Sequence, residues 1–231
     1  MIDKLRLRFS KMGRAKYISH LDLMATMRRA LLRAGIELKY SEGFNPHPYM
    51  SAALPLSVGS SSLCELMDIG VANNIYPDGL IGVANKIYPD GLPEVINNVL
   101  PDGLEVSEVY SPERKFSCIA WVGISGSLYY DVGAPQNVAE KLTARFSEEH
   151  IVISKKTKSG ISDIDISPYI RDTYFSRSGE VTMSARISAQ NPSINPDNLI
   201  SALNGGYEAL MPDFYNFTRT EIFDIDMNVF R

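Results

Sequence analysis

The chain has 231 residues, of which 45% are hydrophobic and 22% charged, the ordinary composition of a globular protein. No apolar run approaches the roughly 18–20 residues that a membrane span needs, and the charged first residues lack the apolar middle of a secretory signal. We therefore expect a cytoplasmic protein with no membrane partner. The net charge of −4 hides an asymmetry, because residues 1–40 carry +7 and the remaining residues carry −11. A basic opening segment in an acidic chain predicts either an anion-binding patch or a solvated face that acidic neighbours balance.

The first half of the chain predicts the element order β-α-β-β-α-β. A strand over 4–10 alternates leucines with Arg6 and Arg8, and a helix follows it. Ser19 and Asp22 fit a capping box at the start of that helix, and Gly35 fits its end. The remaining elements are an extended, turn-rich stretch over 36–62, a strand over 63–71, a short helix over 92–100 and a strand over 103–110.

The second half repeats this order, with strands near 118–132, 150–167, 180–188 and 215–227 and helices near 135–149 and 195–205. The fold class is therefore predicted to be α+β, with two tandem ferredoxin-like domains built on antiparallel sheets. We place the domains at residues 1–112 and 113–231, with the boundary in "SPERK" at 111–115.

Residues 69–80 and 81–92 are identical except for Asn74 and Lys86. Two copies of a 12-residue unit are too few and too short for a solenoid. A local duplication that lengthens one connection is the simpler interpretation, and a dedicated ligand-binding loop is the alternative.

The only two cysteines, Cys64 and Cys118, lie in strand-like stretches outside any C-x-x-C pattern, so we expect both to be buried. The common phosphate-binding, dinucleotide-binding, zinc-protease and nucleophile-elbow motifs are missing. The three histidines are not clustered with other ligands. The sequence therefore predicts no metal site and no cofactor.

The stretch "KYSEGFNPHPYMSAALPLSVG" (39–59) is the strongest candidate for a binding site. Two prolines favour extended backbone at the residues before them, and Gly43 permits backbone angles that other residues avoid. A preformed loop loses less entropy on binding. Its side chains offer rings for stacking and groups for hydrogen bonding, a combination that single-stranded RNA recognition uses: Phe44, Asn45, His47 and Tyr49. A rigid structural turn is the alternative.

Other residues suggest further contacts with RNA, or a reaction. Arg28, Arg29 and Arg33 on the first helix, together with Lys39, could contact phosphates, as could Lys155, Lys156 and Lys158 in a turn. His20, which lies near Tyr17 and Asp22, is either a packing residue or a general acid–base group.

Four motifs in the sequence carry a family resemblance. They are the motif of Tyr40, Ser41, Gly43, Phe44, Asn45, Pro46, His47 and Pro48, the preceding "SHLD", and the later "KKTKSGISDIDISPYI" and "RTEIFD". The chain resembles the radical-SAM-linked proteins, a bacterial family of unknown function found beside or fused to radical SAM enzymes. This implies an accessory to such an enzyme, in agreement with the missing cluster cysteines. The element order also resembles that of the CRISPR repeat-processing endoribonucleases, as an analogy of fold alone.

The sequence thus favours a non-enzymatic accessory protein that binds RNA, such as tRNA or rRNA, for a partner radical SAM enzyme. One alternative is a metal-independent endoribonuclease that uses His20 or His47, with Tyr17 as a further candidate. The other is a protein-interaction module that makes no contact with nucleic acid.

Overall fold

The computed structural model describes residues 3–72, 91–157 and 160–231, and the chain forms two compact units. The first unit ends at Phe116 and includes Arg231, and the second unit extends from Ser117 to Phe230. Each unit is α+β and contains an antiparallel sheet with few helices. The duplication over 69–92 lies mostly in the stretch 73–90, outside the described residues.

The described residues of the first unit form four strands and two α-helices, in the order β1 (Asp3–Lys11), α1 (His20–Arg33), β2 (Met50–Ala52), β3 (Ser61–Val71), α2 (Leu92–Asn97) and β4 (Leu104–Tyr110). A 3₁₀ turn at Gly13–Tyr17 connects β1 to α1. The strand order across the sheet is β4-β1-β3-β2, and every neighbouring pair is antiparallel.

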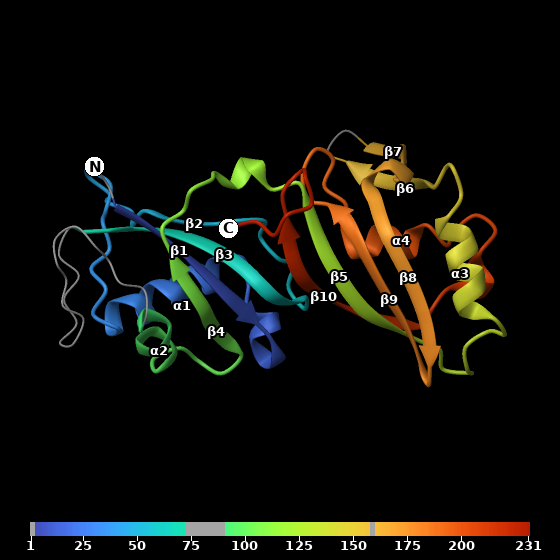
Figure 1. The fold of residues 1–231 in the computed structure, drawn as a ribbon, viewed down its shortest axis with the longest axis horizontal. Helices are drawn as coiled ribbons and strands as arrows, with labels where there is room; N and C mark the ends of the chain where they lie inside the picture. Colours follow the sequence, from blue (N-terminus) through green and yellow to red (C-terminus); the bar gives the residue numbers. More distant parts are fainter. Residues whose placement is uncertain (1–2, 73–90, 158–159) are drawn as a thin grey trace. The chain divides into compact units, whose positions relative to one another are not determined.

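Alternation along β1 produces the core of the first unit. Leu5, Leu7 and Phe9 are buried against the helices, while Arg6 and Arg8 point to the opposite face of the sheet. Both helices contribute to the same core, and Figure 1 shows them close together beside the strands. Burying a side chain of this size stabilises the fold by about 1.5–3 kcal/mol.

Both ends of α1 agree with the sequence. The Ser19 hydroxyl oxygen accepts a hydrogen bond from the Asp22 backbone N–H at 3.2 Å, which confirms Ser19 as the N-cap. In a full capping box the Asp22 carboxylate would accept from the Ser19 backbone N–H. Here it accepts from the Ser19 hydroxyl instead, at 2.7 Å. At the other end Gly35 has φ +76°, and Ile36 donates to the Leu31 carbonyl at 2.9 Å, the bond that closes a Schellman motif.

The described residues of the second unit form six strands and two α-helices, in the order β5 (Trp121–Tyr129), α3 (Val138–Phe146), β6 (Val152–Thr157), β7 (Gly160–Asp165), β8 (Ile170–Ser178), β9 (Glu180–Ser188), α4 (Pro196–Ser201) and β10 (Phe214–Phe223). Its main sheet has the order β10-β5-β9-β8, again antiparallel throughout. Strands β6 and β7 pair only with each other among the described residues. Helix α3 contacts β8, and α4 contacts β6 (Figure 1).

One packing expectation was wrong. Cys64 is buried on β3, as predicted, but Cys118 is exposed. The apolar run around Cys118 predicts a strand, whereas Phe116–Cys118 form a 3₁₀ turn ahead of β5. Alternation cannot bury a residue that lies outside the sheet.

Candidate functional site

The stretch 39–49 forms a closed loop, which we call the 39–49 loop. Its backbone is bridged between Tyr40 and Pro48. The Ser41 N–H donates to the His47 carbonyl at 2.8 Å, and the His47 N–H donates to the Ser41 hydroxyl oxygen at 3.0 Å. The Tyr49 N–H donates to the Lys39 carbonyl at 2.8 Å. These bonds close the loop without help from a partner.

The base of the loop is joined to β3. The Lys39 N–H donates to the Gly70 carbonyl at 2.9 Å, and the Gly70 N–H donates to the Tyr49 carbonyl at 2.6 Å. The loop therefore starts and ends on a central strand of the first unit.

The apex of the loop presents its side chains to solvent. Gly43 has φ +119°, an angle that a residue with a Cβ rarely adopts. Phe44 follows it and is fully exposed, and Asn45 and His47 are exposed as well. Tyr40 and Tyr49 are also more than one-third exposed. Exposed aromatic side chains that gather on one loop, as Tyr40, Phe44 and Tyr49 do, are typical of a binding surface.

The structure divides the basic residues of the opening segment into two groups. Arg6 and Lys11 are buried, so neither contributes to a surface patch. Arg6 Nε and Nη2 donate to the Asp68 carboxylate at 2.6 and 2.9 Å, and Lys11 Nζ donates to the Lys16 carbonyl at 3.1 Å. Burial lowers the pKa of Lys11, and the nearby Glu65 carboxylate partly offsets that effect.

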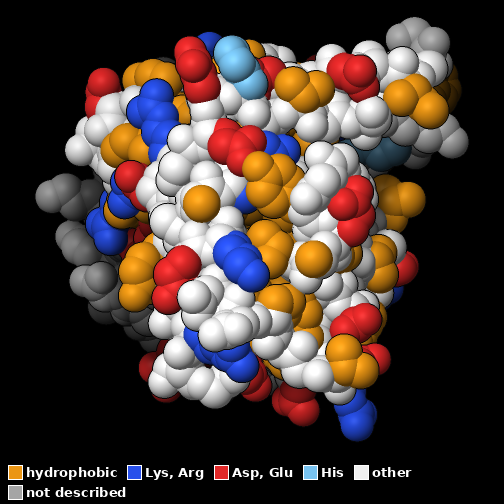
Figure 2. Space-filling model, turned by 90° about the vertical axis from the view of Figure 1, so that its right-hand side faces the viewer, with side chains coloured by type: hydrophobic (Ala, Val, Ile, Leu, Met, Phe, Trp, Pro, Cys, Tyr) orange, Lys and Arg blue, Asp and Glu red, His pale blue; other side chains and the backbone are white. Residues whose placement is uncertain are grey.

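The second group comprises cations that are exposed or half-buried. Lys4, Arg14 and the α1 arginines are exposed. Arg8 Nε lies 3.8 Å from Glu108 Oε1. The net charge of +7 over residues 1–40 is therefore only partly presented at the protein surface. On the face of the second unit that Figure 2 shows, basic, acidic and hydrophobic side chains are interspersed as well.

The predicted phosphate-binding arginines lie along α1, and each is exposed. Arg33 Nη2 donates to the Val99 carbonyl at 2.8 Å, just beyond α2. Arg29 Nη2 lies 3.5 Å from the Thr26 hydroxyl. Among the residues that the structure describes, no hydrogen bond or ion pair links Arg28, Arg29 or Arg33 to the 39–49 loop. Lys39, by contrast, is half-buried at the base of that loop.

The candidate acid–base residues are not joined to one another. His20 is the first residue of α1 and is partly buried, whereas Tyr17 is exposed, with Lys16 Nζ 5.1 Å from the centre of its ring. Within the described stretches, no hydrogen bond connects Tyr17, His20 and His47. A role for them in RNA cleavage stays a prediction.

Of the three lysines predicted in the second unit, only Lys155 has a described side chain. Its Nζ donates to the Ser193 carbonyl at 2.9 Å. The side chain of Lys156 and the whole of Lys158 lie outside what the structure describes.

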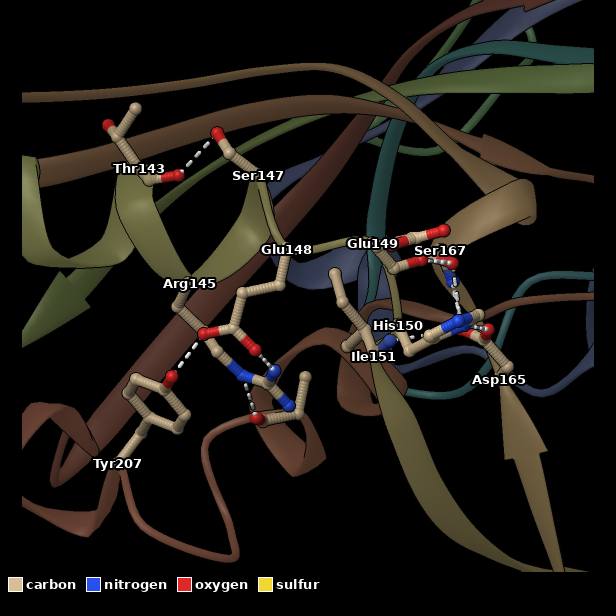
Figure 3. Close-up of polar contacts among 11 residues, drawn as sticks. Thr143, Arg145, Ser147, Glu148, Glu149, His150, Ile151, Asp165, Ser167 and Tyr207 are labelled. Atoms are coloured by element: carbon tan, nitrogen blue, oxygen red, sulfur yellow. Dashed lines mark hydrogen bonds and ion pairs between the residues drawn. The ribbon is translucent and has the colours of Figure 1, made fainter.

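Two polar clusters that the sequence did not suggest lie near the end of α3 (Figure 3). In the first, buried Arg145 bonds Glu148, and its Nε donates to the Ala202 carbonyl at 2.9 Å. The Tyr207 hydroxyl donates to the same Glu148, and this bond is the main cause of the lowered pKa of that carboxyl. The guanidinium carbon lies 4.6 Å from the centre of the Tyr207 ring. This cluster joins α3 to the segment after α4, which gives it a structural role.

In the second cluster, His150 Nδ1 lies 2.7 Å from Asp165 Oδ2. Asp165 Oδ1 accepts bonds from the Ser167 hydroxyl at 2.8 Å and from the Ile151 N–H at 3.0 Å. These bonds, led by that of His150, hold the pKa of Asp165 well below its usual range. A hydrolytic triad needs the histidine to bond the hydroxyl. Here both groups bond the carboxylate, so the cluster fixes the base of the β6–β7 hairpin (Figure 3).

Within the described residues there is no group of histidine, cysteine, aspartate and glutamate side chains that could hold a metal ion. Nor does the described part of the chain contain a helix long and apolar enough to cross a membrane.

A family model named DUF2344, described as an uncharacterised protein conserved in bacteria, matches residues 4–196. The chain belongs to this family. The DUF2344 match includes the 39–49 loop and ends at Pro196, the first residue of α4.

No curated protein matches the chain. A solved structure described as an unknown protein from Galdieria sulphuraria is 10% identical to this chain. The alignment covers 95% of this chain and 99% of that one, at a TM-score of 0.25. A similarity at this level carries no argument about fold or function.

Proposed function

We propose that this DUF2344 protein binds single-stranded RNA through the 39–49 loop. The observation that carries the proposal is the position of Phe44, fully exposed at the apex of a loop that hydrogen bonds between Ser41 and His47 close. A base stacks on such a ring with a gain of about 1–3 kcal/mol. His47, Asn45 and Tyr49 lie on the same loop and offer hydrogen bonds to base edges.

The cations for phosphate would come from α1 and the base of the loop. Arg28, Arg29 and Arg33 are exposed, and Lys39 is half-buried beside Tyr40. The bond from Arg33 to the Val99 carbonyl uses only part of its guanidinium group, which has five donors.

We further propose that the two compact units are tandem ferredoxin-like domains. In each, the elements of the main sheet follow the order β-α-β-β-α-β, once the β6–β7 hairpin is treated as an insertion. In each, the fourth strand pairs with the first, the first with the third and the third with the second, all antiparallel. The family resemblance suggests that a radical SAM enzyme is the partner to which bound RNA would be presented.

Fluorescence anisotropy with a labelled unstructured RNA and with tRNA, measured at several salt concentrations, tests the proposed function. We expect the logarithm of the affinity to fall linearly with the logarithm of the salt concentration. Phe44→Ala should weaken binding by roughly 5- to 150-fold, the equivalent of one stacked base. Val132→Ala is the matched control, because Val132 is also a fully exposed apolar residue but lies in the second unit.

An equal affinity of Phe44→Ala and wild type would overturn the proposal, as would the absence of RNA binding or of a salt slope. The exposed ring contributes no packing in the free protein, so Phe44→Ala should unfold as the wild type does. The wild type could instead bind no RNA but pull down the radical SAM enzyme. If Phe44→Ala then loses this pull-down, the loop is a protein-docking site.

A further inference from the structure

The main sheet of the second unit has one face that the helices do not cover, which we call the open sheet face. On β9, Val181, Met183, Ala185 and Ile187 are buried, so the residues between them point the other way. The strand registers then place small hydroxyl side chains across this face, on all four strands: Ser125, Ser127, Ser176, Thr182, Ser184 and Thr218.

Two arginines lie directly opposite each other at one end of the open sheet face. Arg171 on β8 is the register partner of Arg186 on β9. Like charges in directly opposed positions destabilise a sheet. Arg186 Nη1 bonds Asp172 at 2.8 Å, but within the described residues Arg171 has no carboxylate partner. At this end of the face the two guanidinium groups therefore share one bonded carboxylate, Asp172, and Glu221 lies opposite Gly123, which also pairs with Arg186.

Aromatic rings hold both guanidinium groups in place. The guanidinium carbon of Arg171 lies 4.4 Å from the centre of the Trp121 ring, and that of Arg186 lies 4.7 Å from the centre of the Phe223 ring. Stacking of this kind leaves the N–H edges of an arginine free to bind a phosphate. In addition, the buried Trp121 indole Nε1 has no hydrogen-bond acceptor among the described residues.

Large aromatic side chains are exposed elsewhere on the open sheet face. Tyr174 on β8 is 65% exposed and Phe214 on β10 is 62% exposed. Phe214 is also paired with Tyr129, at 5.7 Å between the ring centres. From strand spacing and register, Tyr174 and Phe214 lie about 20 Å apart across the sheet. An elongated ligand is needed to contact both.

We propose that the open sheet face binds single-stranded RNA, with a phosphate at Arg171 and Arg186 and with bases stacked on Tyr174 and Phe214. The stacked arginines supply charge complementarity to phosphate, and the hydroxyl groups between the rings supply hydrogen bonds to bases and sugars. This inference rests on the proposed function for its class of ligand, but it concerns different residues in a different unit.

Trp121 is the only tryptophan of the chain, so its emission reports on this site directly. We expect a short unstructured RNA to change the emission of the full-length protein at the concentrations at which anisotropy shows binding. Tyr174→Ala should lower the affinity about tenfold, and Arg171→Ala about fivefold with a shallower salt dependence. Both side chains are exposed, so both variants should fold.

Arg177→Ala is the control, because it removes an arginine from the same strand but from the opposite face. It should bind RNA as the wild type does. If RNA binds and depends on Phe44, yet the Trp121 emission and the affinity of Tyr174→Ala do not change, the open sheet face is not an RNA site and the proposed function stands. If no RNA binds at all, both proposals fail. If inorganic phosphate alone changes the emission as effectively as RNA does, the face is a simple anion site and this inference is overturned.

Discussion

Replacing Asp68 with alanine should lower the free energy of unfolding of the first unit by about 3 kcal/mol. Arg6 is fully buried, and its guanidinium group depends on Asp68 for two hydrogen bonds, at 2.6 and 2.9 Å. A third bond, from Nη2 to the Arg114 carbonyl at 2.9 Å, would remain, as would the Phe116 ring at 4.3 Å. Removing the carboxylate therefore takes away the anion that Arg6 Nε and Nη2 bond in the interior.

The magnitude follows from the burial of the two partners. Removing one member of a buried ion pair costs about 3–5 kcal/mol. The lower end of this range applies here. The Asp68 side chain is 19% exposed, so water can reach the Arg6 guanidinium group once the carboxylate is removed. The double variant Arg6→Met with Asp68→Leu should be much closer to the wild type, since it removes both charges and keeps an apolar volume.

Urea unfolding followed by far-UV circular dichroism measures the effect. Tryptophan emission is unsuitable, because the single tryptophan lies in the second unit. With a slope of about 1.5 kcal/mol per molar urea, the midpoint of the first unit should fall by about 2 M.

A midpoint within about 0.5 M of the wild type for Asp68→Ala would refute the reasoning, because it would mean that the Arg6 charge is already solvated in the folded protein. A double variant as unstable as the single one would refute it as well. A small effect of Asp68→Ala would also bear on function, because a solvated Arg6 would belong among the cations available to RNA.

Three further outcomes are expected. Asp165 has a lowered pKa, so it contributes stability above about pH 4, its unfolded value, and loses it as the pH falls further. Asp165→Asn should therefore be less stable than the wild type at pH 7, with a flatter decline in acid, and identical acid limbs in thermal melts would contradict this. Burial raises the pKa of Tyr130 to about 12, and its hydroxyl donates to the Leu210 carbonyl at 2.9 Å. The protonated Tyr130 hydroxyl therefore contributes stability that is complete below pH 10 and is lost as the pH rises towards 12. Because Tyr130 ionises late, Tyr130→Phe should remove one late-ionising group from the alkaline absorbance titration. In the native protein, a thiol reagent should label Cys118 rapidly and Cys64 only on unfolding, because Cys118 is exposed and Cys64 is buried; fast labelling of both would contradict the structure.

The sequence by itself determined the local features. Alternation in 4–10 predicted which side of β1 is apolar, Ser19 and Gly35 predicted the ends of α1, and the glycine and prolines of 39–49 predicted a preformed loop. Each of these depends on neighbours a few residues away, so the local pattern was enough.

Tertiary structure alone decided which charged and aromatic groups are available. Arg6 and Arg33 look alike in the sequence, yet one is buried against Asp68, 62 residues away, and the other is exposed. The apposition of Arg171 and Arg186, and their stacking on Trp121 and Phe223, arise from strand register. Register and burial depend on contacts between distant segments, and a charge count or an alternating pattern carries no information about them.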